Sequence, residues 1–444
     1  MPNPYSLTVQ LYRDGAWHDA LTIDVSKPET GLRGICDYGY VSAYIVDLLN
    51  KPDTRLEGAA SARLPVSWET WHEPHAPAFL LDIIPSGAAG RFLQKRLLHE
   101  KPEGLHLDLF LLSRCTPAPI GNLRIKQSVA HMEDHPLQGF SRAEVITRNT
   151  GFLEYAYEQG AAIGGATGAG GEAPKLLLAE NSTGLLFPDA VLTDTEVTQH
   201  WFVKFARNQA RQVDVDVLTS EFCYYKAIQM IGLDTVPVEG LALEFGGQPS
   251  LWMHRFDRAV THAGIERRAV ESIYSIAGVT EPGAYMDHTQ VVQCLVALWQ
   301  EVGQADQIED LIAEYLMRDL LNQILGNSDN HCRNMSVIRT AQGIKLAPIY
   351  DLAPMVMDPE GVTRTTKWKS PIEIAGNVDW TLACEALSAW ANPIKQMDRL
   401  RTQAQRFMAL PQILERLGLP HATMAHPMVR LGNLSQWLED RGLA

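Results

Sequence analysis

The sequence predicts an α+β fold, with strands concentrated in the first part of the chain and helices in the last. Alternating apolar and polar residues on either side of Asp14-Gly15 predict a β-hairpin over residues 5–24. Beyond residue 257, long stretches such as 287–303 and 307–325 repeat apolar residues at helical spacing. Together these patterns favour a mixed α/β amino-terminal part and a mainly helical carboxy-terminal part.

Length and composition describe an ordinary globular protein. A chain of 444 residues favours about three domains, and we expect them at 1–135, 136–256 and 257–444. The net charge of −14 argues against a broad nucleic-acid-binding surface. The six cysteines include no C-x-x-C pair, which is typical of reduced structural thiols. With neither a membrane-length apolar run nor a signal peptide at the start, we expect a cytoplasmic protein.

Residues 1–135 read as a small α+β domain without an evident catalytic grouping. After the hairpin, residues 38–50 fit either a short strand or a helix, and residues 78–98 pass from an apolar run into an amphipathic helix. Residues 120–126 fit a further strand. For this domain we expect packing or partner contact.

The most glycine-rich stretch, residues 160–180, includes Gly165, Gly168, Gly170, Gly171 and the intervening Thr167. Glycines allow backbone N–H groups to approach a phosphate closely. The stretch matches neither the G-x-x-x-x-G-K-[ST] nor the G-x-G-x-x-G pattern. Taken alone, it is compatible with a flexible linker as well as with a phosphate-binding loop.

Two charged residues follow in otherwise apolar elements. Lys204 lies in the strand-like run 199–205, where a lysine is either a protected sheet edge or a cation that faces a ligand. Residues 217–233 predict a helix with Thr219 or Ser220 as N-cap and Glu221 in its first turn. Glu221 is a candidate partner of Lys204, although acidic residues also favour helix starts because of the helix dipole.

Residues 324–351 carry the strongest motif. An apolar helix stops at Gly326-Asn327, a polar loop holds Asp329 and Asn334, and two strand-like runs lead to Asp351. In protein kinases a loop aspartate accepts the substrate hydroxyl proton, an asparagine five residues later holds Mg²⁺, and a later aspartate chelates metal at the phosphates. The order predicts phosphoryl transfer from ATP with Mg²⁺; loop formation and turn capping are the structural alternative.

In this frame, the glycine-rich loop, Lys204 and Glu221 belong to an N-lobe, and residues 251–256 form a hinge to a helical C-lobe. His254 and Phe256 lie on this hinge, where backbone groups would contact adenine. The sequence thus predicts a bilobal, protein-kinase-like fold with a mixed α/β N-lobe, an N-terminal subdomain and a mainly helical C-lobe.

Two other functions remain open. A metal-dependent hydrolase or nuclease would use Asp329, His331 and Asp351, but it leaves Lys204 and the glycine-rich loop without a role. A catalytically silent kinase fold that acts through a partner is the second alternative. The basic residues 362–370 contact an acidic substrate, stabilise phosphate charge or form a solvated loop.

Several motifs extend over nearly the whole chain: GNSDNHCRNMSV, LAPIYDLAPM, HRFDR, WFVKF, GATGAGGEAPK, FLLDIIPSG and PIGNLRI. In these motifs the chain resembles the HipA family of serine/threonine kinases, the toxins of bacterial type II toxin–antitoxin modules.

The resemblance implies roles for single residues. Asp329 matches the catalytic aspartate, Asn334 and Asp351 match the metal ligands, Lys204 matches the phosphate-binding lysine, and His254 and Phe256 match the adenine hinge. The family's glycine loop carries an autophosphorylated serine. Here Thr167 lies closest to that place and is the candidate for autophosphorylation.

The resemblance also implies partners. The best-known members phosphorylate an aminoacyl-tRNA synthetase, so a translation factor of this kind is a candidate protein substrate. The family usually pairs with a small helix-turn-helix antitoxin, which supplies the DNA binding; we expect no nucleic-acid binding by this chain alone and no membrane association.

Overall fold

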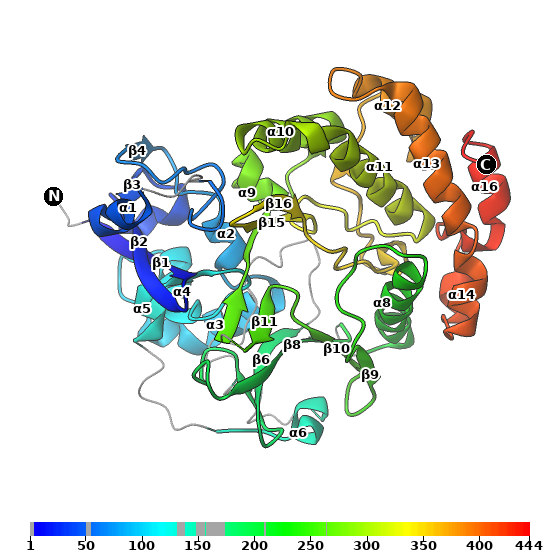
Figure 1. Ribbon diagram of the computed structural model, residues 1–444. Coiled ribbons are helices and arrows are strands. Elements are labelled where there is room, and N and C mark those ends of the chain that lie inside the picture. The colour runs from blue at the N-terminus through cyan, green and yellow to red at the C-terminus, as the bar shows by residue number, and fades with distance from the viewer. Residues whose placement is uncertain are drawn as a thin grey trace.

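The computed structural model describes residues 4–49, 55–130, 138–147, 156, 174–207, 210–262 and 264–444. In Figure 1 an amino-terminal sheet lies at one side of the molecule and helices α12, α13, α14 and α16 lie at the other. A second sheet and α8 lie between them in the chain. No helix among the described residues is long and apolar enough to cross a membrane.

The first sheet has five strands in the order β4-β3-β2-β1-β5, and all its pairs are antiparallel. Its first hairpin turns at Asp14 and Gly15, whose φ angles of 52° and 79° suit a two-residue turn that asparagine, aspartate and glycine favour. The predicted hairpin is therefore confirmed. The elements of this part are β1 (Tyr5–Arg13), β2 (Ala16–Val25), η1 (Pro28–Arg33), β3 (Cys36–Tyr40), α1 (Ser42–Leu48), β4 (Thr70–Glu73), α2 (Leu80–Ile83), α3 (Gly87–Leu97), η2 (Leu98–Glu100), α4 (Leu107–Cys115), β5 (Leu123–Ile125) and α5 (Lys126–Val129).

The second sheet also has five strands, in the order β7-β6-β8-β10-β9, and a separate two-stranded ribbon follows it. One long helix, α8, connects β8 to β9. The elements are α6 (Arg142–Ile146), β6 (Lys175–Asn181), β7 (Leu186–Pro188), β8 (Val197–Phe205), α8 (Gln212–Met230), β9 (Ala242–Glu244), β10 (Ser250–His254), β11 (Arg258–Thr261) and β12 (Gly264–Arg267).

The two faces of the second sheet meet different surroundings. Trp201, Val203 and Phe205 of β8 are buried in the same hydrophobic core as the first sheet. Because side chains alternate along a strand, Phe202 and Lys204 face the opposite side, where a pocket lies. One face of the sheet thus packs against the amino-terminal part, and the other face supplies side chains to the pocket.

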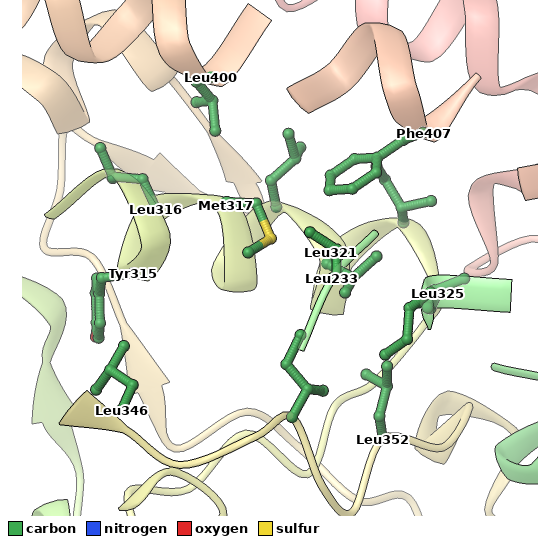
Figure 2. Packing of buried hydrophobic residues seen from close by; sticks show 14 of the residues in the cluster. Leu233, Tyr315, Leu316, Met317, Leu321, Leu325, Leu346, Leu352, Leu400 and Phe407 are labelled. Carbon is green, nitrogen blue, oxygen red and sulfur yellow. The ribbon is translucent and has the colours of Figure 1, made fainter. Parts of the chain in front are cut away.

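The carboxy-terminal part is mainly helical and is built around α11. Figure 2 shows Tyr315, Leu316, Met317, Leu321 and Leu325 packed between α13 residues and the segment that contains Leu346 and Leu352. The elements are β13 (Ala269–Ser272), α9 (Ile273–Ala277), β14 (Met286–Asp287), α10 (His288–Glu301), η3 (Ala305–Gln307), α11 (Ile308–Ile324), β15 (Ser336–Thr340), β16 (Gly343–Leu346), η4 (Met355–Met357), β17 (Thr366–Lys367), β18 (Glu373–Ile374), β19 (Asn377–Val378), α12 (Trp380–Ala386), α13 (Pro393–Phe407), α14 (Leu410–Arg416), α15 (His421–Met424), η5 (Arg430–Asn433) and α16 (Leu434–Glu439).

The predicted start of the helix that carries Glu221 is wrong. The helix α8 begins at Gln212, two turns before Thr219 and Ser220. The Asp214 carboxylate accepts a hydrogen bond from the backbone N–H of Arg211 at 3.0 Å, which satisfies the true start of the helix. Glu221 therefore lies in the middle of the helix and is 1% exposed, so the helix dipole does not account for it.

The strand that leads to Asp351 is also shorter than predicted, since β16 ends at Leu346. Asp351 lies beyond it with a φ of 51°, a left-handed conformation that few non-glycine residues adopt. Such a conformation persists where the surroundings hold it, and it is common at functional sites.

Candidate active site

A pocket lies between the second sheet and the loop that follows α11. Its walls come from β6, β8, α8, the segment after β10, the loop after α11 and the amino-terminal part. The polar and charged residues that line it are Asp82, Lys175, Lys204, Glu221, Tyr225, His254, Arg255, Asp257, Ser272, Arg333, Asn334, Ser336, Tyr350 and Asp351.

Lys204 joins two carboxylates in this pocket. Its Nζ lies 2.5 Å from Glu221 Oε2 and 2.6 Å from Asp351 Oδ1. Burial opposes the charged form of Lys204, but the charges of Asp351 and Glu221 outweigh it and raise the pKa of the ammonium. On the same helix face, Tyr225 donates to Glu221 Oε1 at 2.8 Å. Lys204 is therefore a fixed cation held between α8 and the segment after β16.

Lys175 is a second cation that the sequence analysis did not assign to the site. It lies directly opposite Lys204 in the β6–β8 register, so both side chains are on the pocket face. Its Nζ lies 3.2 Å from Asp351 Oδ2. Burial alone would raise the pKa of Asp351, yet the charges of Lys175 and Lys204 hold it well below the usual carboxyl range. Only a prediction that strand β6 pairs with β8 in this register would have assigned Lys175 to the site.

The loop after α11 is held by its own side chains. The backbone N–H of Asp329 donates to Asn327 Oδ1 at 3.2 Å, and Asn334 Nδ2 donates to the Asp329 carbonyl at 2.8 Å. Asn327 Nδ2 in turn donates to Asn322 Oδ1 of α11 at 2.9 Å. This arrangement places Asp329 and Asn334 side by side and leaves the carbonyl oxygen of the Asn334 side chain to accept other contacts.

Asp329 has different electrostatic surroundings from Asp351. Its nearest titratable partner is His331, whose Nε2 lies 3.5 Å from Asp329 Oδ1. Burial raises the pKa of Asp329, and the charge of Asp351 adds to this effect against the opposing influence of His331. Among the residues that the structure describes, no group of three or more His, Cys, Asp or Glu could hold a metal ion.

His254 and Phe256 both line the pocket, on the segment that leaves β10. The His254 ring contacts Trp201 with centroids 4.5 Å apart, and the Phe256 ring stacks on Tyr350 at 5.6 Å. Burial lowers the pKa of His254. The predicted hinge residues therefore lie in the same pocket as Lys204, Asn334 and Asp351.

A buried ionic network fixes this segment from behind. Arg255 donates to Asp189 Oδ2 at 2.6 Å and to both oxygens of Asp257, at 2.9 and 2.6 Å. Asp257 also accepts from the backbone N–H of Gly121 at 2.8 Å, and burial is outweighed by Arg255 and Arg258 so that the pKa of Asp257 falls to about 2. The backbone of the amino-terminal part is thus bonded to a side chain of the pocket wall.

The amino-terminal part also reaches the pocket itself through Asp82 and Ile120. Asp82 accepts hydrogen bonds from the backbone and the hydroxyl of Ser272, at 2.9 and 2.7 Å, and lies 3.3 Å from Arg333 Nε. Sequence reasoning missed both residues, because nothing near them in the chain indicates a place in this pocket; the partners of Asp82 lie about 190 and 250 positions later.

The predicted phosphate-loop residues Gly165, Thr167, Gly168, Gly170 and Gly171 lie outside the described residues. The strand β6, which follows them, brings Lys175 to the pocket.

The comparison with known families adds to this geometry. A family model described as the HipA-like C-terminal domain matches residues 167–410, which is more than half of the chain. The chain belongs to the HipA family. The match includes every pocket residue from Lys175 to Asp351.

Two relatives place this HipA family member more closely. Over 132 residues it is 30% identical to Y4mE of Sinorhizobium fredii (strain NBRC 101917 / NGR234), a protein named as a kinase, and the match covers 29% of this chain and 30% of that protein. The HipA structure of Shewanella oneidensis MR-1, solved as a toxin–antitoxin complex with HipB and operator DNA, aligns with a TM-score of 0.68 at 16% identity, over 98% of this chain and 99% of that one. At this identity the likeness shows a shared mixed α/β fold.

Proposed function

We propose that this protein is an ATP- and Mg²⁺-dependent protein serine/threonine kinase of HipA type that acts as a toxin. The observation that carries the proposal is the meeting of Lys204, Glu221 and Asp351 within 2.6 Å contacts, beside the loop of Asp329 and Asn334. A lysine–glutamate pair, a metal-binding aspartate and a D-x-x-x-x-N loop are the recurring parts of a protein kinase site.

Each residue has a role in this proposal. Asp329 accepts the proton of the substrate hydroxyl, and its raised pKa brings it nearer to the range of an effective base. Lys204, held by Glu221, and Lys175 neutralise the phosphates. Positioning and charge neutralisation supply most of the rate enhancement in this class of reaction.

Mg²⁺ fits the residues that the resemblance assigns to it. Asp351 is ionised, because two lysines hold its pKa low, and Asn334 retains a side-chain carbonyl oxygen. Such hard oxygen donors are the ligands that Mg²⁺ prefers. When bound, the ion would neutralise charge that develops on the transferred phosphoryl group.

The rest of the site follows the same plan. Residues 1–135 form an N-terminal subdomain, residues 136–256 an N-lobe and residues 257–444 a helical C-lobe, with the nucleotide between the lobes. Backbone groups near His254 and Phe256 contact adenine, and the Gly165–Gly171 amides bind phosphates. Thr167 is the candidate for autophosphorylation, which would repel ATP through its added charge.

The proposed partners follow from the family. HipA of Shewanella oneidensis was solved with HipB and operator DNA, and we propose that this chain pairs with a small helix-turn-helix antitoxin. Its protein substrate would be a translation factor such as an aminoacyl-tRNA synthetase. A short adjacent reading frame whose product co-purifies with this chain would support the pairing.

The test is the intact mass of the purified protein after incubation with Mg²⁺-ATP. We expect a gain of one or more phosphoryl groups in the wild type and in Asp398→Asn, but none in Asp329→Asn or Asp351→Asn. Asp398 is a matched control because its carboxylate is solvent-exposed and lies 3.1 Å from Arg401 of the same helix. Peptide mapping then decides whether Thr167 is the acceptor.

ATP protection against thermal unfolding separates the remaining outcomes. Protection without a mass gain would mean that the kinase modifies other proteins only or that the fold is catalytically silent, and the co-purified partner and a translation extract would then be tested as acceptors. A protein that neither gains mass nor is protected by ATP would contradict the proposal. Protection by a divalent metal without nucleotide would instead favour the hydrolase alternative with Asp329, His331 and Asp351.

A further inference from the structure

The basic segment 362–370 is not a solvated loop. Thr366 and Trp368 are each 3% exposed, whereas Lys369 is exposed. The strand β17 within the segment pairs in parallel with β14, so its backbone is part of a small sheet. This ordering needs a cause, because the segment follows Asp351 closely and carries several like charges.

Two buried carboxylates hold the segment. Arg364 Nη2 lies 3.2 Å from Asp319 Oδ1, and Arg364 Nη1 donates to Glu373 Oε1 at 3.0 Å. The other oxygens of the same carboxylates accept from Trp368, Asp319 from the indole at 2.9 Å and Glu373 from the backbone N–H at 3.0 Å. The side chains of Asp319 and Glu373 are only 3% and 5% exposed.

Neighbouring residues complete the anchor. The backbone N–H of Lys369 donates to Asp287 Oδ2 at 3.0 Å, and the His288 ring stacks on Trp368 with centroids 4.8 Å apart. Arg364, Asp319 and Asp287 are the charged groups around His288. The segment is therefore fixed by α11, β14 and the start of α10 together.

The anchored segment is bonded directly to the catalytic loop. Asn330, the residue after Asp329, donates from Nδ2 to the Thr366 carbonyl at 2.8 Å and accepts from the Thr366 N–H at 3.4 Å. Cys332 Sγ lies 3.3 Å from Thr366 Oγ1. The loop that carries Asp329 and the segment are thus bonded to each other through Thr366.

In many protein kinases a phosphate, rather than a buried carboxylate, holds the corresponding loop in place. There the corresponding loop becomes ordered when a new phosphate pairs with arginines, and the residue before the catalytic aspartate is an arginine. Here Ser328 precedes Asp329, and the negative charges that pair with Arg364 belong to Asp319 and Glu373.

We propose that residues 362–370 form a permanently ordered wall on the acceptor side of the site. Arg364 is the positioning residue that holds this wall and, through Asn330, the loop of Asp329. The segment needs no modification for this. This inference rests on the proposed kinase function and adds its regulation: the segment is ordered without being phosphorylated, so phosphorylation of the segment does not switch the kinase on.

The first test is hydrogen–deuterium exchange of the full chain, purified without ATP and shown by intact mass to carry no phosphate. We expect slow exchange in peptides that cover 362–370. Arg364→Gln should speed exchange there and in residues 327–334 by about tenfold or more, because one of the few buried charged anchors is lost. Arg399→Gln should change neither region, since Arg399 pairs with Asp310 at 2.6 Å on the exposed surface.

The second test is steady-state transfer to the acceptor that the mass and extract experiments identify. Arg364→Gln and Asn330→Ala should lower kcat by about 10- to 100-fold, as expected when a reacting group is displaced by a fraction of its contact distance, with KM for ATP unchanged within about twofold. Arg364→Lys, which can reach one carboxylate, should recover part of the loss. A purely structural role would instead lower ATP protection and the active fraction together.

The outcomes distinguish the two proposals. Fast exchange of 362–370 in the unmodified wild type, or unchanged exchange in Arg364→Gln, would overturn the inference. So would faster exchange with an unchanged kcat, because the segment would then be anchored but irrelevant to transfer. A wild type that neither transfers a phosphoryl group nor binds ATP would contradict the proposed function, while the exchange pattern would still decide whether Arg364 anchors the segment.

Discussion

The surroundings of Asp351 and Asp329 are the two most instructive regions to compare. Asp351 lies between Lys175 and Lys204, at 3.2 and 2.6 Å, and its pKa is held low. Asp329 has His331 at 3.5 Å, and burial raises its pKa. The pKa values of two aspartates in one site are thus shifted in opposite directions. Such a difference suits chemically identical groups to different roles.

The difference follows from where the neighbours come from. Lys175 and Lys204 belong to adjacent strands of a sheet far from Asp351 in the chain, whereas Asp329 is surrounded mainly by residues of its own loop. A sheet can place two cations side by side, because its register fixes neighbouring side chains on one face. The loop instead controls orientation, which a proton acceptor requires more than it requires a counter-charge.

The largest expected effect breaks the Asp329 side of the comparison. Asp329→Asn keeps the shape of the side chain but removes the proton acceptor, so phosphoryl transfer should fall by about 10²- to 10⁴-fold. ATP should still protect the variant against thermal unfolding, because Lys204, Lys175 and Asp351 are untouched. Rates measured at saturating Mg²⁺-ATP check the first part. A variant with wild-type transfer would show that Asp329 is not the base.

The second prediction separates the two lysines on the Asp351 side. Lys204→Met leaves two buried carboxylates without their shared cation and should cost about 3–5 kcal/mol of unfolding free energy. Lys175→Met removes one partner of Asp351 but leaves Lys204 beside that carboxylate, so it should cost less, about 1.5–3 kcal/mol. Urea unfolding of both variants measures the difference. Equal losses of unfolding free energy would mean that the two lysines stabilise the buried carboxylates equally.

The third prediction uses the opposite pKa shifts of the two aspartates. The low pKa of Asp351 means that its charge stabilises the fold at pH 7, so Asp351→Asn should be less stable than the wild type. The raised pKa of Asp329 means the reverse, so Asp329→Asn should be more stable than the wild type at pH 7. Urea unfolding of the two variants and the wild type at pH 7 checks the signs.

The two differences should also disappear in a defined order on acidification. The penalty from Asp329 begins to shrink as the pH falls through its raised pKa and is gone below the ordinary carboxyl value of 3.8. The contribution of Asp351 is lost only as the pH falls through 3.8 and below. The stability gap of Asp329→Asn should therefore close at a higher pH than that of Asp351→Asn; the opposite order would contradict the assigned directions.

The smallest expected effect concerns the support of Glu221. Tyr225→Phe removes the 2.8 Å hydrogen bond to Glu221 Oε1, which should lower the unfolding free energy by about 1–2 kcal/mol, since the acceptor is charged and buried. Transfer should change little if Lys204 remains in place. Thermal unfolding and the rate at saturating ATP measure both effects, and a large loss of rate would show that Tyr225 orients Lys204 as well.

The sequence predicted the parts of the site that lie close together in the chain. A short loop after one helix holds Asp329 and Asn334, and the hairpin follows directly. Their order and spacing could therefore be recognised in the sequence. The helix of Glu221 was misplaced at its start because the Asp214 cap precedes an alternating apolar pattern that does not resemble a helix. Lys175 was missed because its meaning depends on a strand register.

What the sequence determined by itself is therefore local: the hairpins, the helix α11, the loop of Asp329 and Asn334, and the family to which the motifs belong. Only the tertiary structure decided which side chains meet, such as Lys175 with Lys204, Asp82 with Arg333, and Arg364 with Asp319. Local patterns are set by neighbours a few residues apart, through backbone geometry and capping. Contacts across about 30 residues or more depend on sheet register and core packing, which no short pattern encodes.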